Sequence, residues 1–375
     1  MINTNICEYF ARCGGCDLQN IDYANQLKIK DDLIDKLITK YAIVIKDRRN
    51  IIPGSKEPIF YRNSIRFEFC RNTKGELKIA RHNPLSSKNP TITDYCLLQS
   101  EKSNIFLQSI LNIYNKLEYT GEDLWQVKVR EGKFTNEFML EIITINSNLP
   151  LKQELISTIK QFPEIKSLYQ TIAPDKDVYK IIRKLIYGRP VIFEKIGRFK
   201  FQISPESFFQ TNSLGIKTLY DTIKQLADIR IGDRVLDLYT GTGSIAIYLS
   251  ILAKTITGVE SVKQAVNDAN SNARINSITN CKFVCNEVGE FLKNNTNDFD
   301  VIILDPPRAG LQEDIIKLVS KSFFKQLVYI SCNPETFFRD IQMFNKHGIN
   351  LNVLQPIDMF PQTHHIELVG LLRKS

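Results

Sequence analysis

One segment of the sequence identifies the architecture of the C-terminal half: Val235-Leu236-Asp237-Leu238-Tyr239-Thr240-Gly241-Thr242-Gly243-Ser244. Its first residues are typical of a short buried strand, and its last residue begins an apolar helix, so the glycines lie in a strand-to-helix turn. Glycine lets the backbone approach a ligand closely at such a turn. The turn alone is a weak nucleotide-binding signal, because Ala246 takes the place of the third glycine of the dinucleotide fingerprint.

Helices and strands alternate around this turn. Apolar residues at helical spacing predict helices over 214–229 and 244–252, and the segment Thr255–Glu260 is typical of a strand. Further strands are predicted at Lys282–Asn286, Val301–Asp305 and Leu327–Cys332. This order predicts an α/β fold of Rossmann-like type, in which ligands bind at the carboxyl ends of the strands.

An acidic residue, Glu260, ends the second strand nineteen positions after Gly241. A carboxylate at that place can accept hydrogen bonds from both hydroxyls of a ribose. No phosphate-binding lysine follows the turn, and Asp237 lies in the first strand. These features favour S-adenosylmethionine, which has a ribose and an adenine but no phosphate, although a glycine-rich turn can also serve only as a turn.

Two later strands end in residues that can support chemistry: Asp305-Pro306-Pro307-Arg308 and Ser331-Cys332-Asn333-Pro334. In amine methyltransferases, an aromatic residue follows the two prolines and stacks on the target base. Arg308 stands there in this chain, which disfavours methylation of nitrogen. Cys332 instead supplies a nucleophile, whose attack on C6 of a pyrimidine would activate C5 toward a methyl group.

Such a reaction also needs a base that removes the C5 proton. The candidates near the C-terminus are Glu367 and the two histidines His364 and His365. The histidines have a plainer interpretation as turn or packing residues.

Cysteines cluster near the N-terminus, where Cys7, Cys13 and Cys16 follow one another closely and Cys96 is the best candidate for a fourth ligand. Four thiolates suit an iron–sulfur cluster or a zinc ion. Three close cysteines with one distant cysteine favour the cluster, and zinc stays open as the alternative. The remaining cysteines outside the nucleophile are interpreted as buried core residues: Cys70, Cys281 and Cys285.

The composition is that of a globular protein of two domains, with 375 residues, 43% hydrophobic and 24% charged. The net charge of +8 arises in the first half, because residues 1–200 carry 32 Lys+Arg and 23 Asp+Glu, and residues 201–375 carry 17 and 18. A basic half suits a polyanion, although surface charge for solubility is the simpler alternative. We expect domains at 1–200 and 201–375. The sequence shows no export signal and no apolar run of membrane-spanning length, so we expect a cytoplasmic protein.

Together these motifs resemble the uridine C5 RNA methyltransferases, which make 5-methyluridine in ribosomal or transfer RNA. The resemblance extends over most of the chain, through the four cysteines, Tyr61-Arg62-Asn63, Ser207–Asn212, Asp237–Gly243, Asp305–Arg308, Ser331–Pro334 and His364–Glu367. It implies a [4Fe–4S] cluster on Cys7, Cys13, Cys16 and Cys96, with Cys332 as nucleophile and Glu367 as general base. It also implies S-adenosylmethionine contacts from Gln210, Tyr239, Glu260 and Asp305.

The chain begins close to its first cysteine, without the small β-barrel found at the start of many members. Its length and the spacing from Gln210 to Cys332 are most similar to the short subgroup that acts on large-subunit (23S) ribosomal RNA. We therefore expect a C-terminal methyltransferase domain after a smaller α+β RNA-binding domain, acting as a monomer on RNA rather than on DNA or a membrane. A transfer RNA uridine and a non-catalytic iron–sulfur RNA-binding protein are the alternatives.

RNA recognition is expected to use the basic first half. Its candidates for phosphate contacts are Arg62, Arg66, Arg71 and Arg81. A uridine in folded RNA must lie in a loop or flip out of the stack before its C5 can react, and Phe208 or Phe209 could flank the exposed base.

Overall fold

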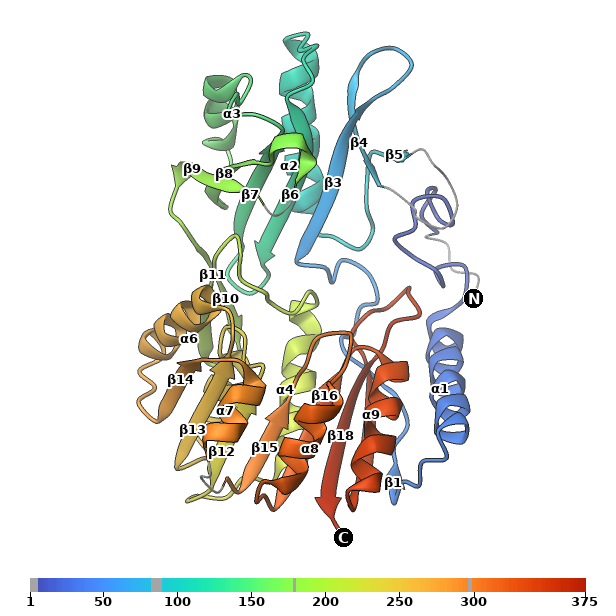
Figure 1. Ribbon diagram of the computed structural model, residues 1–375. Coiled ribbons are helices and arrows are strands. Elements are labelled where there is room, and N and C mark those ends of the chain that lie inside the picture. The colour runs from blue at the N-terminus through green and yellow to red at the C-terminus, as the bar shows by residue number, and fades with distance from the viewer. Residues whose placement is uncertain (1–5, 82–89, 178–179, 296–298) are drawn as a thin grey trace.

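A nine-stranded sheet forms the lower part of the molecule in Figure 1, in the order β1-β17-β18-β16-β15-β12-β13-β14, with β2 also paired to β17. The computed structural model describes residues 6–81, 90–177, 180–295 and 299–375. Strands β12 to β16 run parallel to their neighbours in this set, and β18 lies antiparallel between β16 and β17. The strands are β1 (Asp47–Arg48), β2 (Ile52–Pro53), β12 (Arg234–Leu238), β13 (Thr255–Glu260), β14 (Cys281–Cys285), β15 (Val301–Leu304), β16 (Gln326–Ser331), β17 (Ile349–Asp358) and β18 (Glu367–Lys374).

Helices cover both faces of this sheet, because its central strands are apolar on both sides. Strand β15, Val-Ile-Ile-Leu, is buried throughout and contributes alternate residues to two separate cores. One core includes helices α1 (Tyr23–Lys40), α7 (Val288–Asn294), α8 (Glu313–Lys321) and α9 (Pro334–Lys346). The other includes α4 (Ser213–Ala227), α5 (Ser244–Leu249) and α6 (Lys263–Ile275).

A second sheet of seven strands lies above the first in Figure 1, in the order β5-β4-β3-β6-β7-β8-β9. Its strands are β3 (Ser64–Arg71), β4 (Leu77–Arg81), β5 (Thr91–Thr93), β6 (Leu124–Gly132), β7 (Glu137–Thr144), β8 (Ile165–Ile172) and β9 (Ile182–Gly188), and a 3-10 turn, η1, covers Pro174–Lys176. One face packs on helices α2 (Glu101–Lys116) and α3 (Lys152–Ile159), where Phe106 stacks edge-on against Phe138. The opposite face carries polar residues such as Lys128 and Glu141.

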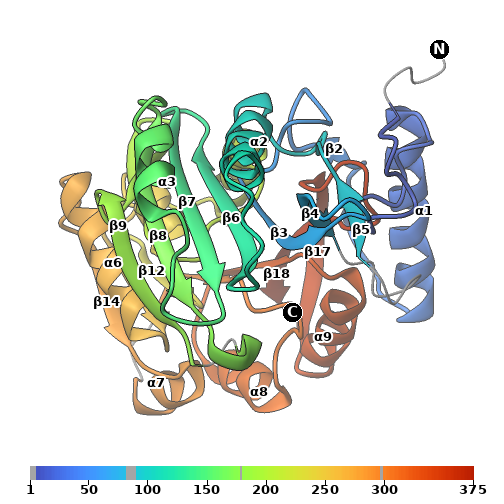
Figure 2. The same cartoon turned by 90° about the horizontal axis from the view of Figure 1, so that it is seen from above.

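The N-terminal segment does not stay with the seven-stranded sheet. Strands β1 and β2 pair with β17, and Ile34 and Leu37 of α1 join the core of the large sheet. Figure 2 shows α1 at one edge of the molecule, far from α6 and β14. The boundary expected at residue 200 therefore does not follow the packing of residues 23–53.

The hairpin of β10 (Ile192–Ile196) and β11 (Phe199–Ile203) crosses the same boundary. Strand β10 packs near β6 and β7, whereas β11 packs near α5 and α6. The hairpin thus joins the two sheets through side chains on both sides of residue 200.

The elements expected around the glycine turn are present within one to three residues of their predicted ends. Cys281 packs against the core, but Cys285 is exposed at the end of the edge strand β14, which corrects its assignment to the core. Within the described residues, no helix is long and apolar enough to cross a membrane.

Candidate active site

The register of β16 and β18 brings the predicted nucleophile, Cys332, close to the predicted base, Glu367. Ser331 at the end of β16 pairs with Leu368 of β18, so Cys332 follows β16 at the place where Glu367 begins β18. Leu304 of β15 pairs with Tyr329 of β16, so Asp305 leaves the sheet at the same edge. Because β18 runs antiparallel, its first residue lies at the carboxyl end of its parallel neighbours.

Hydrogen bonds join the two motifs that follow β15 and β16. The carbonyl of Arg308 accepts from Asn333 Nδ2 at 3.0 Å and from Thr336 Oγ1 at 3.3 Å. Asn333 also caps α9 by accepting from the amide of Glu335 at 3.2 Å. The Arg308 guanidinium lies 3.1 Å from Nδ1 of His365. The turn that presents Cys332 is therefore held by the Asp305–Arg308 segment.

The electrostatics of this edge are dominated by burial. Burial raises the pKa of Glu367 well above its ordinary value, and the negative charge of Asp305 adds to this. Burial, followed by the charge of Glu367, raises the pKa of Cys332 to about 11. Arg308 lowers the pKa of both groups, so its charge favours the anionic forms of the thiol and the carboxyl.

The histidines next to Glu367 differ from it in burial. His364 and His365 are exposed, whereas Glu367 is 2% exposed. The ring of His365 packs edge-on against Phe360 at 6.0 Å and contacts Arg308. Of the three candidates for the base, Glu367 is the one buried beside the thiol.

The glycine turn leaves open space next to the first strand. Gly241 and Gly243 have φ values of 54° and 75°, and a Cβ on Gly241 would meet no atom within 4 Å. The Glu260 carboxylate accepts from the amides of Gly241 at 3.1 Å and Val262 at 2.9 Å, which fixes it at the end of β13. Tyr239, also at positive φ, follows β12 beside it.

Two buried carboxyls stand below this turn. Asp237 accepts from Thr240 Oγ1 at 2.5 Å through one oxygen, while its other oxygen is buried without a hydrogen-bond partner. Burial raises the pKa of Asp237 to about 7, and burial together with Asp237 raises the pKa of Asp305 to about 7. An unpaired oxygen of Asp237 beside an open glycine turn suits a cationic ligand, and S-adenosylmethionine carries a sulfonium and an ammonium group.

Gln210 enters from the segment before α4. The backbone carbonyl of Gln210 accepts a hydrogen bond from Asn63 Nδ2 at 2.8 Å. Asn63 Nδ2 also donates to Ser213 Oγ at 2.7 Å. In this segment Phe208 is 67% exposed, whereas Phe209 packs on Phe201 with ring centroids 6.4 Å apart. Phe208 is therefore the aromatic side chain that is free to contact a ligand.

The four N-terminal cysteines line one cavity, together with Phe67 and Arg81 among other residues. Burial raises the pKa of Cys16 to about 12, with Cys96, Cys13 and Cys7 adding to this and Arg81 opposing it. Yet in the part of the chain that the structure describes, no three Cys, His, Asp or Glu side chains are placed to hold one metal ion. The structure therefore brings the four thiols to one cavity and does not distinguish a cluster from a zinc ion.

The predicted phosphate contacts divide into two pairs. Arg66 is exposed and Arg62 is half-buried, so both present charge at the surface. Arg71 is engaged with the carbonyls of Gly75, Tyr119 and Gly121 and lies over the Tyr119 ring. Arg81 lines the cysteine cavity. The structure therefore gives Arg71 and Arg81 roles within the protein.

Sequence reasoning missed several residues of this region. Asn63 and Arg308 appeared within motifs, but their links to Gln210 and to the Cys332 turn follow from the fold. Lys30 and Asp358 form a buried ion pair at 2.6 Å although 328 positions separate them. No local pattern in the sequence indicates such a pairing.

The strand order, with an antiparallel β18 between β16 and β17, and the glycine turn facing Glu260 define an S-adenosylmethionine-dependent methyltransferase. The chain belongs to the tRNA (uracil-5-)-methyltransferase family, whose match covers residues 22–375.

Two relatives and one solved structure support this family assignment. An uncharacterized RNA methyltransferase of Oceanobacillus iheyensis is 34% identical over 96% of this chain and 81% of its own length. One from Caldanaerobacter subterraneus is 33% identical over 98% and 84%. The crystal structure of Pyrococcus abyssi tRNA (uracil-54, C5)-methyltransferase in complex with S-adenosyl-L-homocysteine matches with a TM-score of 0.77 and 28% identity, over 96% of this chain and 85% of that one.

Proposed function

We propose that this protein methylates C5 of a uridine in large-subunit (23S) ribosomal RNA, with Cys332 as nucleophile and Glu367 as general base. The observation that carries this proposal is the register of β16 and β18, which puts a thiol and a buried carboxyl side by side at the carboxyl edge of a methyltransferase sheet. Gln210, Tyr239, Glu260 and Asp305 are proposed to hold the cofactor. S-adenosylmethionine supplies the methyl group when it is bound.

The chain's own residues can supply the other steps. The Cys332 thiolate adds to C6, the electrons of the C5–C6 double bond move into the ring carbonyl, and C5 becomes the carbon that takes the methyl group. The Glu367 carboxylate then removes the C5 proton, the electrons of the C5–H bond restore the double bond, and the C6–Sγ bond breaks. Arg308 supports both steps, because its charge favours the thiolate and the carboxylate.

Two RNA classes are candidates for the substrate. The spacing of the motifs from Gln210 to Cys332 supports ribosomal RNA. A specific observation favours transfer RNA as the second candidate, namely the similarity to the Pyrococcus abyssi enzyme, whose name gives a tRNA uridine as its target. In both cases Phe208, the exposed Arg66 and the half-buried Arg62 would face the RNA.

We also propose a [4Fe–4S] cluster on Cys7, Cys13, Cys16 and Cys96. A cluster takes one thiolate on each of several irons. The support for this proposal is that all four thiols line one cavity. The positive charge of the half-buried Arg81 offsets part of the negative charge that such a ligand set carries.

The substrate is tested with transcripts of large-subunit ribosomal RNA and of transfer RNAs that contain 5-fluorouridine. Fluorine at C5 cannot leave as a proton, so we expect a protein–RNA adduct that survives denaturation on one RNA class and not on the other. Trapping on transfer RNA alone would overturn the ribosomal assignment. Absence of trapping on both classes would overturn the uridine C5 reaction.

The cluster is tested by analysis of anaerobically purified protein. We expect iron and sulfide in about equal amounts and a brown colour. Stoichiometric zinc without iron would overturn this part of the proposal.

A further inference from the structure

The turn between β17 and β18, residues 359–366, leads directly into Glu367. It contains no glycine, and Gln362 adopts a left-handed conformation with φ of 70°. A residue with a Cβ is disfavoured there, so neighbouring contacts must hold the conformation. Some contacts lie within the turn, where Thr363 Oγ1 donates to the carbonyl of Phe360 at 2.8 Å. Asn212 Nδ2 donates to the carbonyl of Met359 at 3.0 Å, and Arg308 contacts His365. The contacts to the centre of the turn come from the first 61 residues of the chain.

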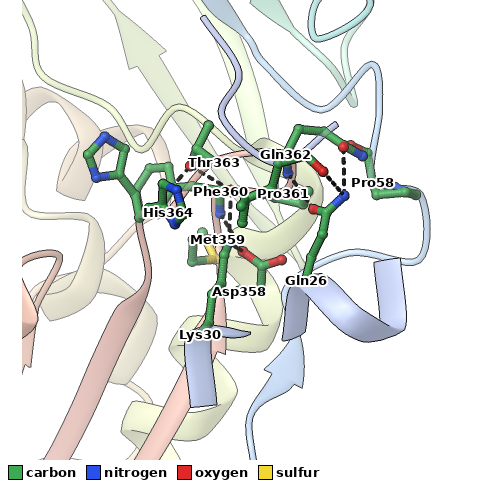
Figure 3. Close-up of polar contacts among 12 residues, drawn as sticks. Gln26, Lys30, Pro58, Asp358, Met359, Phe360, Pro361, Gln362, Thr363 and His364 are labelled. Carbon is green, nitrogen blue, oxygen red and sulfur yellow. Dashed lines mark hydrogen bonds and ion pairs between the residues drawn. The ribbon is translucent and has the colours of Figure 1, made fainter. Parts of the chain in front are cut away.

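Gln26 of helix α1 holds the centre of this turn. Its Nε2 donates to Gln362 Oε1 at 2.9 Å, and its Oε1 accepts from the amide of Gln362 at 3.0 Å. Both side chains are buried, with 0% exposure for Gln26 and 2% for Gln362. Figure 3 shows the two amides facing each other, with Pro58 on the far side of Gln362. This paired arrangement fixes both the side chain and the backbone of the left-handed residue.

Lys30, one helical turn further along α1, holds the start of the turn. Its ammonium lies 2.6 Å from Asp358 Oδ1 and donates to the carbonyl of Phe360 at 3.1 Å (Figure 3). The same carboxylate accepts from the amide of Phe360 at 3.1 Å, and its other oxygen accepts from Tyr23 OH at 3.0 Å. Asp358 follows Ile357, the strand partner of Glu367, so the ion pair lies next to the base in the ladder.

The same turn is also bonded to the cysteine-bearing segment. The carbonyl of Gln362 accepts from the amides of Asp17 at 2.9 Å and Leu18 at 3.1 Å, immediately after Cys16. Tyr61 OH donates to the carbonyl of Pro361 at 3.0 Å. The turn is thus fastened from α1 on one side and from the cysteine region on another.

A buried ion pair is weak evidence of a stabilising role, because desolvation of both charges offsets much of their attraction. Such a pair does specify one arrangement of the groups that it joins, since a shift would leave a buried charge unpaired. None of Gln26, Lys30 or Asp358 belongs to the residues at the carboxyl edge that react. Their bonds reach the backbone of the segment that delivers Glu367.

We propose that Gln26 and Lys30 are positioning residues for the general base, holding residues 359–366 so that Glu367 meets the C5 proton. This inference rests on the proposed function. It predicts a selective defect, because Cys332 comes from β16 and the α9 cap and does not depend on these contacts. Loss of the contacts should slow removal of the C5 proton and leave thiol attack and methyl transfer largely intact.

The test uses the full-length protein with S-adenosylmethionine and ordinary uridine transcripts of ribosomal and transfer RNA. Gln26→Met keeps the volume of the side chain and removes its hydrogen bonds. We expect turnover to fall about tenfold to a hundredfold, as for an active-site displacement of about 1 Å. At the same time the share of protein found as a denaturation-resistant RNA adduct should rise above that of the wild type, as expected for Glu367→Gln. Lys28→Met is the control, because Lys28 is exposed on the same helix.

A second variant distinguishes loss of positioning from loss of folding. Lys30→Met combined with Asp358→Leu replaces the ion pair by apolar groups, a change that proteins often tolerate, while it removes the bonds to Phe360. We expect this double variant to be folded, as a cooperative unfolding transition would show, and to accumulate the RNA adduct. If turnover and adduct fall together in folded variants, or if both variants resemble Lys28→Met, the positioning role is overturned. If wild-type protein fails to trap 5-fluorouridine RNA, the proposed function itself has failed.

Discussion

Cysteine is used in two different settings in this molecule. Cys332 follows β16 near the buried carboxyl of Glu367, the carboxyl of Asp305 and the cation Arg308. Cys16 lies among three other thiols in a cavity with Arg81 and apolar side chains. Burial raises the pKa of both thiols, so burial does not distinguish them. Their neighbours do, because a base beside a thiol permits a reaction cycle and further thiols beside it provide a ligand set.

Removing each cysteine should separate the two settings most clearly. We expect Cys332→Ala to abolish trapping of 5-fluorouridine RNA and all methyl transfer, with the iron content of the protein unchanged. Cys16→Ala should lose iron and sulfide. Gel analysis of adducts and metal analysis on the same preparations check both results. Trapping that survives in Cys332→Ala would remove the distinction between the two sites.

The proposed base next to Cys332, Glu367, should give the next largest effect. Glu367→Gln preserves size but cannot accept the C5 proton, so turnover should fall by about 10² to 10⁴. Adduct with ordinary uridine RNA should accumulate, since attack at C6 precedes the lost step. Single-turnover kinetics with denaturing gels measure both quantities. Equal loss of adduct and product would contradict the assignment of Glu367.

The thiol chemistry of Cys332 should depend strongly on pH. Because its pKa is about 11, the thiolate fraction should rise about tenfold per pH unit between about pH 7 and pH 10. Alkylation of Cys332 by iodoacetamide, followed by mass spectrometry of its peptide, should rise in parallel. Arg308→Gln should slow the reaction at each pH, because Arg308 lowers the pKa of the thiol. An unchanged rate in that variant would show that the arginine does not act on Cys332.

The carboxyls beside the glycine turn should make cofactor binding depend on pH. Asp305 has a pKa of about 7, so it is largely protonated below that pH and negatively charged above it. The negative form attracts the cationic groups of S-adenosylmethionine, and affinity should therefore rise severalfold between about pH 6 and pH 8. Calorimetric titration measures this change. Asp305→Asn should bind more weakly and with a flatter pH profile.

The smallest effect is expected at the arginines of the seven-stranded sheet. Neutralising the exposed Arg66 should reduce the salt slope of RNA binding by about one. Neutralising Arg71 should leave the slope unchanged, because its guanidinium bonds three carbonyls of the protein. Filter binding over a range of salt concentrations checks both. A reduced slope for Arg71→Gln would place the RNA on the other end of β3.

Sequence reasoning placed the glycine turn and its flanking elements well, because their signals are local. The strand over 234–238, the positive-φ glycines and Glu260 lie within 27 positions of one another, and helix and strand periodicity sets their order. The same reasoning failed for the first segment of the chain. Residues 23–53 were assigned with the basic half, yet α1, β1 and β2 pack on the C-terminal sheet. Amphipathic spacing shows that a helix has an apolar face, but not which core will bury it.

The sequence by itself determined the α/β class, the strands that end at the reactive edge and the residue types that can act there. Those properties depend on short-range spacing and on the chemistry of single side chains. Only the tertiary structure placed Glu367 opposite Cys332, because an antiparallel strand had to insert between β16 and β17. It also decided that Lys30 meets Asp358 and that Gln26 meets Gln362. Such pairs arise from packing between distant segments, where burial of both polar partners selects the arrangement that satisfies them.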